Sequence, residues 1–427
     1  MKTKTYLMIG ILFLPLLLTA QQKWTLEQCI DTAWTNNRNV KQQALAKKTR
    51  EINYEQARQN LLPSVNASAS QNFNLGSSVD KFINPKSSTS VGLGAQLTLF
   101  DGLRMKYNID ARKAEMLQSD AELQKLKLDI ATYVAAGFLQ ILQNKELLQI
   151  ATDQLELTKT KIEQRKNLVA AGKLAEGELL DLVAQQSKEE MNRLKAENTY
   201  KLSLLDLAQL LEIDHFEDLE LAVPENITEL ELQILSPDEV LKSALTHRPE
   251  ILGADYKLKS SEINALSAKS EYYPTLTLGA QSGTGYYNFP GAGTLGKQFS
   301  DNFNTVVGLN LQIPIFNKFS VRNKVRTAQI GIESDKLNVS NAKLELRKTI
   351  QQAYFNAISA KSRWESAQKS EAASREAYRF TNQKYEAGRA TVYELYQSKS
   401  NLTQVLSEGV QAKYEYVFRI KLLEYLK

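Results

Sequence analysis

The sequence predicts an α+β membrane protein built from a duplicated helix–hairpin–helix unit. Three observations lead to this fold class. The chain has two related halves, each half contains two short segments with a hydrophobic period of two, and each half ends in a long stretch without proline, at 102–213 and 317–427. A period of two is typical of strands, whereas proline-free stretches rich in Ala, Leu, Glu and Lys are typical of helices.

The first twenty residues have the layout of a secretory signal peptide. Lys2 and Lys4 precede an apolar run over 6–18, and Ala20 offers a small residue for cleavage. The run is shorter than the roughly 20 residues that a spanning helix needs, and charged or amide side chains interrupt every later helical segment. A mature protein that enters a membrane must then do so as a closed β-barrel, because lipid leaves open backbone groups without partners.

The charge balance and the rare residue types exclude several classes of function. Without residues 1–20 the chain has Lys+Arg 51 against Asp+Glu 48, a net charge of about +3 without blocks of one sign, which does not favour nucleic-acid binding. His215 and His247 form no HxxxH or HExxH motif. With no nucleophile motif or phosphate loop either, we expect no enzyme, no metal site and no cofactor.

Cys29 is the single cysteine, so the chain cannot form an intramolecular disulfide. It lies in the run TLEQC, which lacks the apolar and small residues that precede a lipid-attachment cysteine. We therefore expect a non-lipidated protein in which Cys29 is a small helix-packing residue.

Residues 24–43 and 235–254 form an internal repeat at an offset of 211 positions. Both segments should begin a helix. Thr25 is followed by glutamine three positions later and is expected to cap the first helix, while Ser236 and Glu239 are expected to form a capping box at the second.

Each of these first helices is expected to be followed by a break. The breaks should lie near 36–39 and before Pro249, because a residue that precedes proline avoids the α region. A second amphipathic helix should then run as far as Pro63 in the first copy and Pro274 in the second.

After these two prolines the hydrophobic period becomes two, which predicts β-hairpins at 63–101 and 274–316 with a glycine-rich loop in the second. One face of each strand is apolar and the other is rich in Ser, Asn, Thr and Gln. Strands of about 10 to 13 residues can cross a bilayer. Aromatic residues gather at the strand ends, as in the girdles of outer-membrane barrels: Phe100, Phe316, Tyr272 and Tyr273 at one end, and Phe73, Tyr286, Tyr287 and Phe303 toward the loops. A soluble sandwich is the alternative for such strands.

The proline-free stretches predict two long helical hairpins. Apolar residues recur at steps of three and four, which is typical of coiled packing, as in Leu123, Leu126, Ile130, Val134, Phe138 and Ile141. The turns are expected near Gly172 and Gly388. Each hairpin should have a helix of about 70 residues, about 100 Å long, and a returning helix of about 40. The first repeat is thus assigned to 21–213, the second to 235–427, and an inter-repeat segment to 214–234.

Four strands cannot close a barrel wide enough for passage, and open sheet edges are not tolerated in lipid. Other copies of the chain should therefore complete the wall. Three chains would supply twelve strands, an even number within the range of outer-membrane barrels. The residues alone do not fix the number at three.

These features together resemble the TolC-like outer-membrane efflux protein family, also called outer membrane factors. The likeness rests on the duplicated plan, on HRPEI at 247–251, on LTLFDG and IPIFNK, which close the second strand of each hairpin, and on AAGK and EAGR at the helical turns. It implies a homotrimer in the cell outer membrane that extends into the periplasm. A 12-stranded β-barrel would continue into a long α-helical barrel, with 214–234 and the C-terminal end in an equatorial belt.

The resemblance also implies the function. The trimer would be a passive exit duct of a tripartite efflux or type I secretion system, opened at its periplasmic end by a periplasmic adaptor and an inner-membrane RND or ABC-type pump. The helical turns would be the adaptor-docking tips: Gly172, Lys173, Leu174, Gly388, Arg389 and Ala390. The glycines could instead only permit a turn with positive φ.

Relatives often narrow the closed end with acidic residues shortly after the second turn glycine. The matching positions are Glu394 and Gln397, with Glu178 and Asp181 in the first copy. Gln397 departs from an acidic pattern, and Glu394 could simply lie on a solvated helix face. The alternative for the whole chain is a structural or adhesive coiled-coil protein of the periplasm or cell surface, which leaves the hairpins and the duplication unexplained.

Overall fold

The computed structural model describes residues 23–74, 87–173, 175–216, 219–223, 234–288, 291 and 293–427. The expected signal peptide, Leu174 and most of the expected inter-repeat segment lie outside these residues. The chain divides into two compact units, one of Met1–Asn37, Ile130–Ile234 and Phe355–Leu422, the other of Arg38–Asp129, Leu235–Tyr354 and Leu423–Lys427. Each unit combines parts of both sequence repeats.

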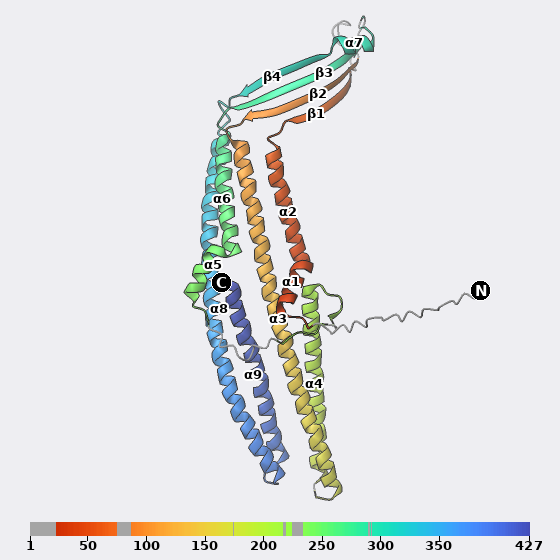
Figure 1. The fold of residues 1–427 in the computed structure, drawn as a ribbon, viewed down its shortest axis with the longest axis vertical. Coiled ribbons are helices and arrows are strands. Elements are labelled where there is room, and N and C mark those ends of the chain that lie inside the picture. The colour runs from red at the N-terminus through yellow and green to blue at the C-terminus, as the bar shows by residue number, and fades with distance from the viewer. Residues whose placement is uncertain are drawn as a thin grey trace, which may run out of the picture. The chain divides into compact units, whose positions relative to one another are not determined.

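The helices occur in corresponding pairs (Figure 1). They are α1 (Leu26–Asn36) with α5 (Pro237–His247), α2 (Arg38–Gln59) with α6 (Pro249–Ser270), α3 (Arg104–Ala170) with α8 (Ser320–Glu386), and α4 (Glu176–Leu211) with α9 (Val392–Leu426). The first two pairs begin 211 residues apart and the last two begin 216 residues apart. The internal repeat of the sequence is therefore repeated in the secondary structure.

The predicted helix breaks are confirmed. Asn37 separates α1 from α2, and Arg248 separates α5 from α6. Arg248 has φ −68° and ψ 128°, outside the α region, because the ring of the following proline crowds a helical conformation at this position. The buried side chain of Asn37 donates a hydrogen bond to the backbone oxygen of Leu210, 3.2 Å away, and so ties this break to the end of α4.

Only one of the two predicted helix caps is present. The side chain of Thr25 accepts a hydrogen bond from the backbone N–H of Gln28 (3.3 Å), and the Gln28 side chain accepts one from the N–H of Thr25 (3.0 Å). The capping box predicted for Ser236 and Glu239 is wrong, because the Ser236 side chain makes no capping hydrogen bond. Pro237 fixes the backbone of the first helical residue and acidic side chains occupy the first turn, which stabilises this start without the box.

The unit that contains α1 has a core made by helices from both repeats. The predicted stripe of α3 is buried at Ile130, Val134, Phe138 and Ile141, each with at most 4% of its surface exposed. Cys29 of α1 is fully buried, and burial raises the pKa of its thiol to about 12. The thiol therefore stays protonated and packs as a small apolar group, as expected.

The segment before α1 is tied to the part of the same unit that follows α4. Trp24 forms a parallel β-bridge with Leu221. Its N–H donates to the backbone oxygen of Glu220 (2.8 Å), and its own backbone oxygen accepts from the N–H of Ala222 (2.9 Å). These bonds fix the chain directly after the expected signal peptide.

The other unit contains a four-stranded antiparallel sheet in the order β1-β2-β3-β4 (Figure 1). The strands are β1 (Ser64–Phe73), β2 (Ser87–Phe100), β3 (Thr275–Asn288) and β4 (Asn304–Gln312). β4 ends four residues before the predicted position, since Pro314 cannot donate a ladder hydrogen bond. The short helix α7 (Leu295–Asp301) lies where only a glycine-rich loop was expected.

Helix α7 is held to the end of β3 by Gln298. The side-chain amide of Gln298 accepts from the N–H of Tyr287 (2.9 Å) and donates to the backbone oxygens of Tyr287 (3.1 Å) and Gly293 (3.0 Å).

Among the residues described, no helix is both long and apolar enough to cross a membrane.

Gly102, in the turn between β2 and α3, gives a test of this packing. Its φ is +71°, and a Cβ atom there would lie 2.8 Å from both the backbone oxygen of Ser270 and the Cβ of Tyr273. We expect Gly102→Ala to destabilise the fold by about 1–3 kcal/mol through overpacking. Thermal unfolding of the detergent-solubilised protein, followed by circular dichroism, would show a lower Tm.

Gly94→Ala is the matched control, since a Cβ at Gly94 meets no atom within 4 Å. Equal Tm values for the two variants would show that the turn is looser than described.

Candidate functional surfaces: the sheet faces and the helical turns

The register of the sheet places most apolar strand positions on one face, with Val306 as an exception opposite Gln281. Directly paired residues share a face, and the chain of partners Val65↔Ala95↔Ala280↔Val307 crosses all four strands. The apolar face comprises Val65, Ala67, Ala69, Val91, Leu93, Ala95, Leu97, Leu276, Leu278, Ala280, Val307, Leu309 and Leu311. The alternation that was read from the separate hairpins thus forms one continuous surface.

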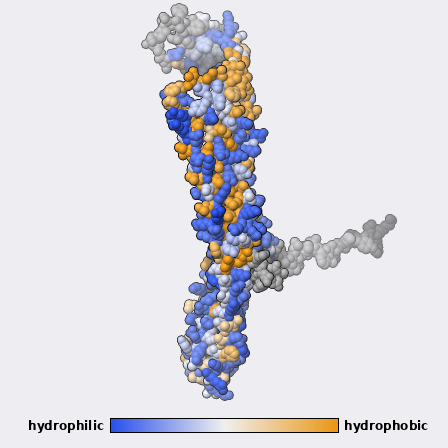
Figure 2. Space-filling view, turned by 90° about the vertical axis from the view of Figure 1, so that its left-hand side faces the viewer, coloured by the Kyte–Doolittle hydropathy of each residue, from blue (hydrophilic) through white to orange (hydrophobic). Residues whose placement is uncertain are grey.

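This apolar face is not covered by the described part of the chain. Val65, Val307 and Leu309 are 66–68% exposed, values that a layer of a soluble sandwich would not show because such a layer buries one face. Apolar residues also reach the molecular surface among hydrophilic ones in Figure 2. A large uncovered apolar surface marks contact with lipid or with another protein.

The opposite face is polar and hollowed. A cavity of about 520 Å³ lies against it, lined by side chains that include Asn66, Gln96, Thr277, Gln281 and Asn310 and by several glycines. The four strands contain no charged residue. The sheet therefore presents mainly neutral hydrogen-bonding groups to the hollow and mainly aliphatic side chains on the other face.

Both outer strands have an open edge. Among the described residues β1 pairs only with β2, and β4 pairs only with β3. The outer N–H and C=O groups of β1 and β4 consequently have no ladder partner in the described chain, and such edges are templates for pairing with another strand.

The predicted interface aromatics lie at the two ends of the strands, although not all on one face. Phe100 and Tyr273 line the same cavity of about 400 Å³. Tyr272 is exposed, and Phe316 packs edge-on against Phe319 with ring centroids 5.6 Å apart.

At the other strand end, Phe73 and Phe303 are exposed. Tyr286 lies on the apolar face with Thr89, whereas Tyr287 lies on the polar face with Ser88. Successive strand residues point to opposite faces, so these two tyrosines cannot belong to the same ring of side chains.

The two helical turns have the same backbone structure. Gly172 has φ +63° and Gly388 has φ +69°. The N–H of Gly172 donates to the backbone oxygen of Val169 (2.9 Å), and the N–H of Lys173 donates to that of Leu168 (2.9 Å). This pattern is a Schellman motif, which ends α3 with a left-handed glycine.

The second turn repeats the motif. The N–H of Gly388 donates to the backbone oxygen of Tyr385 (3.0 Å), and the N–H of Arg389 donates to that of Lys384 (2.8 Å). Lys173 and Arg389 are exposed and Ala390 is half-buried. A Cβ at Gly172 or Gly388 would meet nothing within 4 Å, so their backbone conformation is what requires glycine at these two turns.

Glu394, a constriction candidate, caps its own helix. Its carboxylate accepts from the N–H of Thr391 (2.7 Å), and its N–H donates to the Thr391 hydroxyl oxygen (3.2 Å). The hydrogen bond from the Thr391 backbone holds the pKa of Glu394 below its usual value. The cap is therefore complete at neutral pH and is lost as pH falls through that lowered pKa. The T-x-x-E pattern of the capping box, at 391–394, was the sequence signal for it.

The remaining constriction candidates differ in their surroundings in the single chain. Glu178 lies 3.5 Å from the hydroxyl of Tyr385, which donates to it. Tyr385 itself is buried, with the Arg165 guanidinium 4.4 Å from its ring centroid. Asp181 and Gln397 are exposed. The chain thus uses Glu178 in a contact between α4 and α8, while Asp181 and Gln397 face solvent.

Comparisons with known proteins show the family to which the chain belongs. The family described as "Outer membrane efflux protein" matches residues 29–212 and 240–419. The chain belongs to this family. It is therefore an outer-membrane efflux protein, and the main functional prediction is confirmed over the coiled-coil or adhesin alternative.

Relatives and a solved structure agree with this assignment. The chain is 21% identical over 413 residues to the toxin and drug export protein A of Aggregatibacter actinomycetemcomitans, covering 92% of this chain and 83% of that protein. It is 22% identical over 321 residues to SilC of Salmonella typhimurium, a probable outer membrane lipoprotein, covering 72% and 65%. The crystal structure of CusC, 18% identical, superposes with a TM-score of 0.79 over 94% of this chain and 91% of that one, which shows the same fold.

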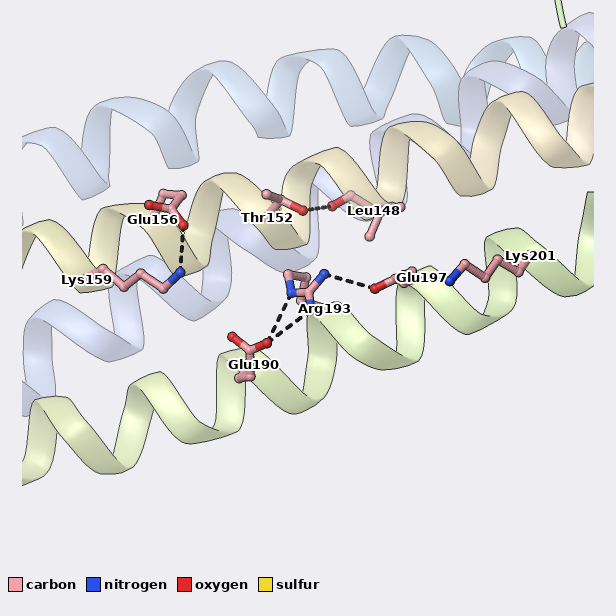
Figure 3. Close-up of polar contacts among 8 residues, drawn as sticks. All are labelled: Leu148, Thr152, Glu156, Lys159, Glu190, Arg193, Glu197 and Lys201. Carbon is pink, nitrogen blue, oxygen red and sulfur yellow. Dashed lines mark hydrogen bonds and ion pairs between the residues drawn. The ribbon is translucent and has the colours of Figure 1, made fainter. Parts of the chain in front are cut away.

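The long helices of the efflux protein carry ion pairs within one helix. On α4, Arg193 pairs with Glu190 (3.1 Å) and Glu197 (3.0 Å), and Lys201 also reaches Glu197 (2.8 Å) (Figure 3). These partners are three or four positions apart on one helix and support its local structure. In the described part of the chain, no group of three or more His, Cys, Asp or Glu side chains is placed to hold a metal ion.

The cap at Thr391 can be tested in the purified efflux protein. Thr391→Ala removes the hydroxyl acceptor, so the backbone N–H groups of the first turn of α9 lose a partner. We expect hydrogen exchange at the Glu394 amide to become about fivefold faster, the ratio that corresponds to roughly 1 kcal/mol for a lost cap. Mass spectrometry of peptides that span the turn would measure it.

Ser236→Ala at the start of α5 is the control, because that side chain makes no capping hydrogen bond. If hydrogen exchange became equally faster at the starts of α9 and α5, the capping box at Thr391 would not be the cause of the protection.

Proposed function

We propose that this outer-membrane efflux protein works as the passive exit duct of a tripartite efflux or type I secretion system. The observation that carries the proposal is the sheet, which combines an uncovered apolar face, a hollowed polar face without charge and two open edges. An exit duct needs these properties, because its wall faces hydrocarbon outside and aqueous solutes inside.

The protein would form a homotrimer with a 12-stranded barrel. Pairing of β4 with β1 of the next copy would satisfy both open edges, which lipid requires. Helix α8 offers a second contact. Ile330, Leu337 and Leu344 are seven residues apart and 71%, 67% and 63% exposed, an apolar heptad row typical of a seam between packed helices. The long helices of three copies would continue the wall as an α-helical barrel in the periplasm.

The strand-end aromatics would mark the membrane interfaces. Phe73, Phe100, Phe303 and Phe316 with Tyr272 and Tyr273 suit the interface, where amphipathic or apolar rings lie at headgroup level. Tyr286 shares the apolar face, while Tyr287 would face the interior of the barrel.

The two helical turns would dock a periplasmic adaptor, which in turn binds an inner-membrane pump of the RND or ABC class. Lys173 and Arg389 are exposed beside glycines in two identical turns, and they offer two related sites per chain to a repeating partner. Leu174, outside the described residues, would complete the first site, and Gly172, Gly388 and Ala390 the backbone of both. The relative named for toxin and drug export supports a transport partner.

The narrow end of the closed duct would form between copies. Glu394 is engaged in its helix cap and Glu178 at Tyr385, so the exposed Asp181 and Gln397 are the candidates with free side chains. A Gln in place of an acid would leave this end with less negative charge than a double acidic ring.

The mature protein would not be lipidated, and residues 1–20 would be removed as a signal peptide. Cys29 is fully buried inside α1, where an attached acyl chain has no room. SilC, which is named a probable lipoprotein, would differ in this respect.

Locking the turns tests the duct. We expect cells that depend on the Lys173→Cys/Arg389→Cys variant for drug export to lose export under oxidation and to regain it with a reductant, because crosslinked turns cannot separate. Cys29 is buried and does not compete for the crosslink. Growth on a panel of drugs, in a host that lacks its own exit duct, would measure this effect.

The two single-cysteine variants are the controls for oxidation itself. Full export through crosslinked turns would refute opening at this end.

The α8 seam gives a test of the trimer. Leu337→Lys places a charge in the middle of the apolar row, and we expect it to shift the protein from trimer toward monomer, because burying an unpaired ammonium is strongly unfavourable. Light scattering of the protein in detergent would give the mass.

Leu337→Met keeps an apolar side chain and should stay trimeric. A wild-type protein that is monomeric in membranes would contradict the proposed assembly directly.

A further inference from the structure

A cavity of about 400 Å³ lies where the sheet passes into the helices, between the end of α6 and the turn from β2 to α3. Its walls are mainly apolar or aromatic and include one cation: Phe100, Leu103, Tyr107, Leu266, Tyr273 and Lys269. The two walls are in direct contact, since a Cβ at Gly102 would lie 2.8 Å from the backbone oxygen of Ser270. The cavity is therefore a defined part of this unit, and the transport of solutes does not account for it.

A β-bulge brings Phe100 to this cavity on the apolar side of the sheet. Strict alternation along β2 from Leu97 would place Phe100 on the polar face. The register shifts between Thr98 and Phe100, however, and Phe100 pairs with Leu276, which belongs to the apolar face. The extra residue of a bulge turns the side chains that follow it to the other face. The cavity therefore continues the surface that faces hydrocarbon in the proposed barrel.

Leu103 stands beside the cavity in a rare backbone conformation. Its φ is +71°, in the left-handed region that a leucine seldom occupies. Its side chain is 51% exposed, so burial within the described chain does not explain that conformation. Backbone outliers of this kind indicate a functional constraint. Here the constraint is the presentation of an apolar side chain next to the cavity.

Lys269 is the only charged residue that lines the cavity. Its side chain is exposed, and in the described part of the chain its ammonium group makes no hydrogen bond or ion pair. The two acids of the neighbouring segments are already engaged, since Asp101 pairs with Arg104 (3.5 Å) and Glu271 with Lys324 (2.7 Å). Lys269 thus offers an uncompensated positive charge beside an apolar hollow.

The surroundings of the cavity carry an excess of positive charge. Residues 100–107, 266–274 and 316–324 contain two acids against six exposed basic residues: Arg104, Lys106, Lys269, Lys318, Arg322 and Lys324. The four strands, by contrast, contain no charged residue. With the sheet in lipid, these cations lie at the level of the headgroups on the helical side of the membrane, where clustered lysines and arginines attract anionic lipids.

We propose that this cavity binds an anionic glycerophospholipid from the membrane leaflet next to the helices. Lys269 pairs with the phosphate of the headgroup, and the start of one acyl chain packs against Phe100, Leu103 and Leu266. The proposal rests on the proposed duct function for the placement of the sheet in lipid. A lipid that binds only the native protein stabilises it, and a lipid held at this level fixes the depth of the sheet in the membrane.

Native mass spectrometry of the full-length protein in detergent, titrated with phospholipids, tests the site. We expect phosphatidylglycerol to bind more tightly than phosphatidylcholine. Lys269→Gln should lower the phosphatidylglycerol affinity about fivefold, the ratio that corresponds to one lysine charge near a lipid surface, and so reduce the preference. Lys269→Arg keeps the charge and should bind like the wild type. Lys257→Gln is the control, because Lys257 is also exposed on α6 but lies about 18 Å away along the helix.

Leu266→Gln tests the apolar wall. The variant keeps the approximate size of the side chain, and position 266 is 45% exposed, so the fold should tolerate the amide. We expect weaker binding of both phospholipids, because the acyl chain loses an apolar contact. Thermal unfolding gives a second readout: phosphatidylglycerol should raise the Tm of the wild type more than that of Lys269→Gln or Leu266→Gln.

Inorganic phosphate in large excess should not displace the lipid, since it lacks an acyl chain. Wild-type affinity for phosphatidylglycerol in folded Lys269→Gln, or full displacement by inorganic phosphate, would overturn the lipid site.

Conductance in planar bilayers separates this proposal from the duct. A wild-type protein that conducts but shows no preference for the anionic lipid would keep the duct and overturn the lipid site. A protein that binds the lipid as described but never conducts would keep the lipid site and overturn the duct.

Discussion

The hydrogen-bonding requirement of the backbone at two sheet edges is the constraint on which the other features depend. A four-stranded sheet with an uncovered apolar face cannot lie in lipid with β1 and β4 open, because each unpaired N–H or C=O group there costs several kcal/mol. Closure with further copies, as proposed, would remove the edges. The neutral Ser, Asn, Gln and Thr side chains of the polar face would then line the interior, and the aliphatic side chains would form the outer surface.

The duplication explains how one chain supplies both halves of a repeating wall. Helices of equal or nearly equal length recur at offsets of 211 and 216 residues. The difference of five residues lies between the two strands of the second hairpin, where α7 is found. Both turns end in the same Schellman motif. The copies differ in how the next helix begins, since Thr391 and Glu394 form a capping box whereas Ala175 provides no capping side chain. The helix after the second turn, α9, therefore has a side-chain cap at its start, whereas α4 does not.

Local signals in the sequence were sufficient to predict the positions of most helices and strands. They were insufficient to predict which residues of different elements contact one another. Proline and capping patterns located the helix breaks at Asn37 and Arg248, and a period of two located the strands. Hydrophobic periodicity did not predict the early end of β4, which Pro314 causes. It also did not predict the helix α7 in the loop between β3 and β4. The Lys399–Glu189 pair joins residues 210 positions apart, and no spacing rule links them, because only tertiary packing brings α9 and α4 together.

The strands and the long helices differ in the charged residues that they contain. The strands contain no ionisable acid or base apart from the tyrosines of β3, whereas the long helices carry many ion pairs within one helix turn. A charge on a strand would face either hydrocarbon or a narrow hollow, and both environments penalise it. Helices in water tolerate exposed charges at almost no cost. Lys399 is the exception, since it is 5% exposed. Removing its charge from water is costly, and its hydrogen bonds to Gln154, Thr158 and Glu189 on two other helices compensate for that cost.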